Sequence, residues 1–196
     1  ASQARERVLT NDELVAVWQA TGEDHPFHRI VRLLLLTGQR RTEVGAMDWS
    51  EVDLEAGIWN LPAARAKNRR QHLIPLAAPA RELLTAQAGY GRTGLVFPNR
   101  RGGPYSDWGA QKARLDQRTR LAPWQLHDLR RSMVTHLAED LAIPPHIIEV
   151  TVNHVSGFRA GVAGVYNRAL YLEERRQALD AWAQHLLALV AAKPGA

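Results

Sequence analysis

The sequence predicts a mainly α-helical fold with one small three-stranded antiparallel sheet. Apolar residues recur at helical spacing along most of the chain, whereas short apolar or alternating runs are confined to residues 48–76. The length of 196 residues is that of one domain, and no internal linker, repeat or low-complexity tract interrupts it. We therefore expect residues 1–196 to form a single domain.

Three helices are predicted before the sheet. Thr10 followed by Glu13 is a capping-box pattern, which begins a helix of about ten residues. Pro26 begins a second helix, and its many apolar residues are typical of a buried core helix. Gly38 suits the left-handed cap that ends this helix. A third, short helix begins near Arg40.

The next segment changes to strand-like patterns. Residues 49–54, 58–61 and 72–76 are short apolar or alternating runs, separated by a turn at residues 55–57 and by a basic loop. Helical spacing then resumes up to the C-terminal region. The helices predicted there cover residues 79–88, 108–118, 127–140, 144–152 and 172–192.

Composition limits the possible functions. Lys and Arg number 25 against 20 Asp and Glu, for a net charge of +5 and a pI near 10.1, which favours an anionic partner such as nucleic acid or a membrane surface. The absence of cysteine excludes disulfides, thiolate metal sites and a cysteine nucleophile. The apolar runs are far shorter than a bilayer span, so we expect a soluble, intracellular protein without a membrane partner.

The sequence TGQRRTE at residues 37–43 places arginine at a helix start. A cation there is unfavourable because the N-terminal end of the helix dipole is positive, so Arg40 needs an anion or a carboxylate. Glu43 lies on the same face and could brace the guanidinium group. A phosphate-binding arginine and an ordinary surface salt bridge both fit this heptapeptide.

Three further positions carry side chains that suit phosphate chemistry. His127 and Arg130 share a helix face, and an arginine can hold phosphate oxygens through two parallel bonds. His154 ends a later helix and Tyr166 precedes the last one. Taken singly, each has an ordinary reading as a capped helix, a structural histidine or a core tyrosine.

Taken together and in this order, these motifs resemble the tyrosine recombinase (phage integrase) family, from about residue 10 to residue 185. The segments TGQRRTEVGAMDW and YNRALYLEERRQALDAWAQHL are most similar to the prophage and genomic-island integrase branch. The resemblance implies the catalytic-domain fold of that family and a site-specific DNA recombinase. The family carries a DNA-gripping domain ahead of the catalytic one, and we expect residues 1–196 to hold the catalytic domain alone.

The resemblance also implies the chemistry. Tyr166 is expected to attack a backbone phosphodiester and form a 3′-phosphotyrosyl link, with neither a metal ion nor another cofactor. Arg40 and Arg130 match the two arginines that clamp the non-bridging oxygens. Tyr171 is the competing nucleophile, but it matches an aromatic residue that opens the family's last helix.

The remaining implied roles concern protons and the phosphate oxygens. His127 is expected to accept or relay the proton of the phenol, and His154 to hydrogen-bond a phosphate oxygen. Lys67, on the hairpin of the small sheet, matches the general acid for the leaving 5′-oxygen. Many relatives have glycine before the later histidine, where this chain has Asn153, the residue after glycine that best tolerates a left-handed cap.

The implied partner is double-stranded DNA, on which the protein is expected to assemble as an oligomer in the bacterial cytoplasm. Two other readings keep the same scaffold: a DNA-relaxing enzyme like type IB topoisomerases, and a DNA-binding module without catalysis. A metal hydrolase built on His127, Asp128 and His154 is a third, although no metal-ligand spacing such as HExxH appears.

Overall fold

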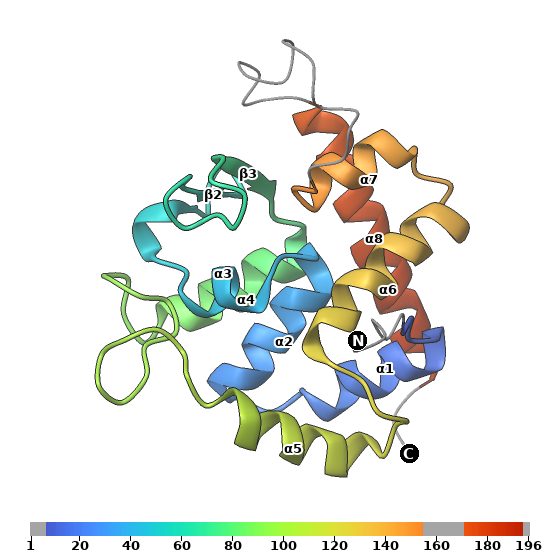
Figure 1. Ribbon diagram of the computed structural model, residues 1–196, viewed down its shortest axis with the longest axis horizontal. Helices are drawn as coiled ribbons and strands as arrows, with labels where there is room; N and C mark the ends of the chain where they lie inside the picture. The colour runs from blue at the N-terminus through green and yellow to red at the C-terminus, as the bar shows by residue number, and fades with distance from the viewer. Residues whose placement is uncertain (1–6, 155–170, 194–196) are drawn as a thin grey trace, which may run out of the picture.

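The computed structural model describes residues 7–154 and 171–193, and it confirms the predicted mixture of many helices with one small sheet (Figure 1). The elements follow the predicted order closely. They are α1 (Asn11–Ala20), α2 (Pro26–Thr37), α3 (Arg41–Gly45), the 3-10 turn η1 (Trp49–Glu51), β1 (Val52–Asp53), β2 (Ile58–Leu61), β3 (His72–Pro75), α4 (Ala78–Ala88), α5 (Trp108–Thr119), α6 (Leu126–Glu139), α7 (Pro145–Thr151) and α8 (Leu172–Ala192).

The first predicted strand is wrong over residues 49–51, which form η1. The Asp48 carboxylate accepts a hydrogen bond from the Ser50 backbone N–H at 2.9 Å, and this local bond favours a turn over an extended chain. Only Val52–Asp53 remains to pair with β2. The sheet order is β1-β2-β3 with both pairs antiparallel, and Leu61 lies opposite His72 at the hairpin end.

Helix α2 forms the centre of the core. Most of its side chains are buried, and α3, α4, α6 and α8 all pack against it. Its end is the predicted one, because Gly38 caps it with φ 63° in the left-handed region. The capping box of α1 is also present, with Thr10 and Glu13 bonding each other's backbone N–H groups.

Helix α8 folds back across the domain, and in Figure 1 its red ribbon runs behind α6 and α7. It packs on α1, α7 and α2, and the fully buried Trp182 donates its indole N–H to the Leu35 carbonyl at 2.7 Å. The apolar face of this helix is therefore covered within its own domain. In the described ranges, none of the helices has the length and apolar character needed to cross a membrane.

Candidate active site

Arg40 and Glu43 form the ion pair that the sequence predicts. Arg40 is the N-cap of α3, and its Nη1 lies 3.1 Å from the Glu43 Oε1 atom. The other carboxylate oxygen accepts the Arg40 backbone N–H at 3.1 Å. Glu43 is only 2% exposed, so its negative charge acts in a poorly solvated place and offsets the unfavourable cation at the helix start.

Arg130 is fixed by the ends of two helices. It is 7% exposed and donates from Nη1 to the Gly38 carbonyl at 2.8 Å and from Nη2 to the Val152 carbonyl. These carbonyls are the C-caps of α2 and α7, where the helix dipoles are negative. A guanidinium group has five N–H donors, so this anchoring orients Arg130 and leaves donors for an anion.

Charge effects place Arg40, Arg130 and His127 in one electrostatic environment. Burial, followed by the charge of Arg40, lowers the pKa of Arg130 to about 10, and the guanidinium nevertheless stays protonated at neutral pH. Desolvation, then the charges of Arg130 and Arg131, lower the pKa of His127 below its usual 6.5, and Arg40 adds to this effect. His127 is therefore mostly neutral at pH 7 and able to accept a proton.

His127 and Arg130 line a cleft of about 570 Å³, which we call the histidine cleft. His154 lies on the same cleft, just beyond the end of α7, and its side chain is exposed. The other lining residues are Val8, Arg131, Val134, Thr135, Ile148, Glu149 and Val152. Of these, Arg131 pairs with Asp128 at 2.8 Å, and Asp128 also accepts the Gln125 backbone N–H, so this carboxylate is used in capping α6.

Lys67 lies on the loop between β2 and β3, residues 62–71, which we call the hairpin loop. Its side chain is exposed, and its backbone N–H donates to the Glu43 Oε1 atom at 3.2 Å. The carboxylate that holds Arg40 thus also holds the backbone of Lys67. Of the six candidates, His127, Arg130 and His154 line one cleft. Arg40 follows the Gly38 carbonyl that Arg130 binds by two residues, and Glu43 links Arg40 to the backbone of Lys67, while Tyr166 lies outside the described residues.

The residues that hold the hairpin loop are not among those that the sequence predicts. Arg65 donates to both carboxylate oxygens of Glu51, at 2.6 Å from Nε, and to the Glu43 carbonyl at 3.2 Å. Asn68 bonds Asn153, 85 positions away. Local residue spacing does not predict such contacts, because each contact joins segments that come together only in the folded chain.

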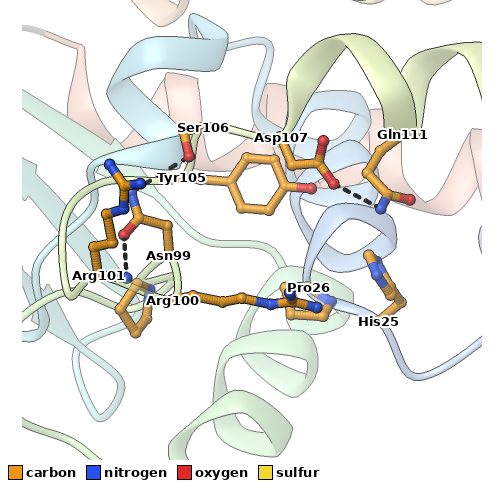
Figure 2. A pocket seen from close by; sticks show the side chains of 10 residues that line it. His25, Pro26, Asn99, Arg100, Arg101, Tyr105, Ser106, Asp107 and Gln111 are labelled. Carbon is orange, nitrogen blue, oxygen red and sulfur yellow. Dashed lines mark hydrogen bonds between the residues drawn. The ribbon is translucent and has the colours of Figure 1, made fainter.

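A second hollow, of about 700 Å³, lies between the start of α2 and the loop before α5, and none of the five described candidates lines it (Figure 2). Its polar side chains are largely engaged with one another: Asn99 bonds the loop backbone and Ser106, and Asp107 accepts from Gln111 at 2.9 Å. The Tyr105 hydroxyl is buried, and none of the described residues accepts a hydrogen bond from it. Burial raises the pKa of Tyr105 to about 12.

The chain is similar to known integrases in sequence and in fold. The model of the phage integrase family matches residues 7–169. Prophage integrase IntZ of Escherichia coli (strain K12) is 34% identical over 165 residues, covering 82% of this chain and 40% of the relative. Tyrosine recombinase XerD of Mycobacterium tuberculosis (strain ATCC 25618 / H37Rv) is 30% identical over 168 residues, which are 76% of this chain and 53% of XerD.

Among solved structures, a lambda integrase dimer bound to a COC′ core site superposes with a TM-score of 0.63 at 20% identity, over 80% of this chain and 60% of that one. This likeness shows the fold. The chain spans about two fifths to one half of the length of the curated relatives it matches. The family model covers most of the chain, and the chain belongs to the phage integrase family of tyrosine recombinases.

Proposed function

We propose that this chain cuts and rejoins double-stranded DNA at specific sites through a 3′-phosphotyrosyl intermediate. The observation that carries the proposal is that Arg130, which lines one cleft with His127 and His154, binds the Gly38 carbonyl, two residues before Arg40 and far from Arg130 in the sequence. Two guanidinium groups in one environment repel each other, and the single carboxylate of Glu43 offsets only part of their charge, so a further anion is favoured there. A phosphodiester supplies that anion.

In the proposed step, the Tyr166 oxygen attacks the phosphorus and the bond from phosphorus to the 5′-oxygen breaks. Neutral His127 takes the phenolic proton, and Lys67 gives a proton to the leaving 5′-oxygen, so protons and charges balance. Arg40 and Arg130 neutralise the two non-bridging oxygens, where negative charge accumulates, and His154 donates to one of them. The 5′-hydroxyl of a partner strand later reverses the step.

DNA as the partner is supported by the net charge of +5 and by the fold, which is that of a lambda integrase described as a dimer on its core site. Each arginine or lysine that neutralises a backbone phosphate releases counterions, so binding should weaken steeply with salt. We propose that the protein assembles as an oligomer on DNA. This assembly would bring two strands within exchange distance.

Covalent capture tests the proposal. The protein is incubated with nicked duplexes that carry a random core sequence, so that a short cleaved fragment diffuses away and traps the adduct. Adducts are resolved under denaturing conditions and their DNA is sequenced, which identifies the preferred site. Tyr166→Phe should abolish the adduct, because phenylalanine has no oxygen to attack phosphorus.

Tyr171→Phe is the matched control. Tyr171 is the N-cap of α8 and its ring meets that of His146 at 5.2 Å, a contact that phenylalanine keeps. The Tyr171→Phe variant should therefore form adducts at the wild-type rate. Absence of any adduct with the wild-type chain, or adducts that persist in Tyr166→Phe, would refute the proposed function. A wild-type protein that forms adducts and changes the linking number of a plasmid, but never joins two different duplexes, would indicate a topoisomerase.

A further inference from the structure

Helix α7 ends in a left-handed turn that delivers His154 to the histidine cleft. The His154 backbone N–H donates to the Glu149 carbonyl at 2.9 Å, and that of Asn153 donates to the Val150 carbonyl at 3.3 Å. These two bonds define a Schellman motif, whose left-handed position glycine usually fills. Here that position is Asn153, with φ 54°. Asparagine tolerates this conformation better than most L-residues, and here one further interaction also favours it.

That interaction is a reciprocal pair of amides. The Asn68 Nδ2 atom donates to Asn153 Oδ1 at 2.7 Å, and the Asn153 Nδ2 atom donates back to Asn68 Oδ1 at 3.2 Å. Asn68 also reaches the Asn153 carbonyl at 3.3 Å. Asn153 is only 3% exposed, so water competes weakly for these bonds. We call this contact the amide latch.

The amide latch lies next to the proposed proton donor. Asn68 directly follows Lys67, and the Lys67 backbone N–H is held by Glu43, the partner of Arg40. The chain at Lys67 is thus anchored on one side to the Arg40 pair and on the other to the turn that precedes His154. Its exposed side chain is the part that these anchors leave able to move.

We propose that Asn68 and Asn153 are positioning residues, which hold the hairpin loop so that Lys67 meets the leaving 5′-oxygen while His154 meets the same phosphate. The inference rests on the proposed function of the site. Loss of the latch should weaken the proton transfer from Lys67, because a loop that is anchored on one side only holds the ammonium group in place for a smaller share of the time. It should affect steps without that proton transfer much less.

A sulfur atom in place of the bridging 5′-oxygen separates these effects. When the bond from phosphorus to sulfur breaks, the leaving thiolate has a conjugate acid with a pKa of about 8.5, so it departs without a proton. An oxygen leaving group needs the proton, because the pKa of an ordinary hydroxyl is close to the value of about 15.7 for water. A defect in delivering the proton is therefore rescued by sulfur, whereas a defect in folding or DNA binding is not.

The experiment measures single-turnover adduct formation on the captured duplex, with either oxygen or sulfur at the scissile 5′ position. The variants are Asn68→Ala, Asn153→Gly, the double variant and Lys67→Ala. Asn153→Gly keeps a residue that accepts the left-handed turn and removes only the amide. Asn60→Ala is the control, because it breaks the bond between Gln71 Nε2 and Asn60 Oδ1, a 2.7 Å amide contact on the same hairpin that does not reach α7.

We expect Asn68→Ala to slow cleavage of the oxygen duplex by about tenfold or more and of the sulfur duplex by less than about threefold. Lys67→Ala should show the same rescue with a larger loss on oxygen. The double variant should be no slower than the slower single variant by more than about twofold, because both changes break one contact. Asn60→Ala should match the wild type on both duplexes.

Each of the other outcomes would refute a specific part of the proposal. Equal losses on both duplexes in Asn68→Ala, no loss on either, or effects that multiply in the double variant would refute the latch while leaving the recombinase reaction in place. Failure of sulfur to rescue Lys67→Ala would refute Lys67 as proton donor, and the latch with it. A wild-type chain that forms no adduct on either duplex would refute the proposed function itself.

Discussion

Gly38 is the position where the fold and the candidate site depend on one missing side chain. Its φ of 63° is left-handed, so alanine there costs about 1 kcal/mol in backbone strain. The new Cβ would also lie 2.6 Å from the Met133 Sδ atom, in a core where Met133 is fully buried. Overpacking of this kind costs about 1–3 kcal/mol, although a methionine side chain can yield in part. We expect Gly38→Ala to lower the free energy of unfolding by about 2–4 kcal/mol.

Urea unfolding followed by circular dichroism measures this change. With a slope of about 2 kcal/mol per molar urea, the midpoint should fall by about 1–2 M. Gly109→Ala is the control: Gly109 lies in α5, and apart from the local helix backbone and its chain neighbours nothing lies within 4 Å of the place that an alanine Cβ would take, so alanine should raise stability slightly. A Gly38→Ala midpoint equal to that of the wild type would refute the reasoning. Because the Gly38 carbonyl anchors Arg130, the variant should also cleave DNA more slowly.

Three further predictions follow from buried or titrating groups. Glu43→Gln removes the buried charge that holds Arg40, so the rate of single-turnover adduct formation should fall by about 100-fold. Glu55→Gln, at an exposed position, is the control, and a loss below about threefold in Glu43→Gln would contradict the prediction. Tyr105→Phe removes a buried hydroxyl that has no acceptor among the described residues, and should raise the free energy of unfolding by up to about 1 kcal/mol. Tyr90→Phe, on an exposed ring, should not raise it, and a destabilised Tyr105→Phe variant would count against the geometry in Figure 2. The rate of adduct formation should fall as pH drops through the pKa of His127, which burial holds below 6.5, because protonated His127 accepts no proton. A fall in rate centred above pH 6.5, or one that persists in His127→Asn, would exclude this role for His127.

The helices and their ends can be predicted from the sequence because their signals are local. The capping box at Thr10, the proline at the start of α2 and the left-handed cap at Gly38 each lie within a few residues of the structure they determine. The pairing of Arg40 with Glu43 is predictable for the same reason, since a spacing of three residues fixes a common helix face. The 3-10 turn at residues 49–51 is not, because its alternating apolar pattern is also that of a strand.

The surroundings of the candidate site cannot be predicted in this way. Arg130 is oriented by two carbonyls, and the hairpin loop is held by Arg65 and Asn68, through contacts that join distant parts of the chain. Backbone carbonyls carry no sequence signal at all. Asn153 offers the one clue, because an asparagine in place of glycine at a left-handed turn suggests that its side chain has a partner.

The central claim is that Arg40 and Arg130 neutralise one scissile phosphate, and a neutral substrate tests it most directly. Single-turnover cleavage by the wild type, Arg40→Ala and Arg130→Ala is compared on the captured duplex with a phosphodiester and with a methylphosphonate at the scissile position. With the charged phosphate, each variant should lose about 100-fold or more. With the methylphosphonate, which lacks the negative charge, each loss should shrink to within about tenfold. Equal losses on both duplexes would show that the two arginines serve the fold and not the phosphate.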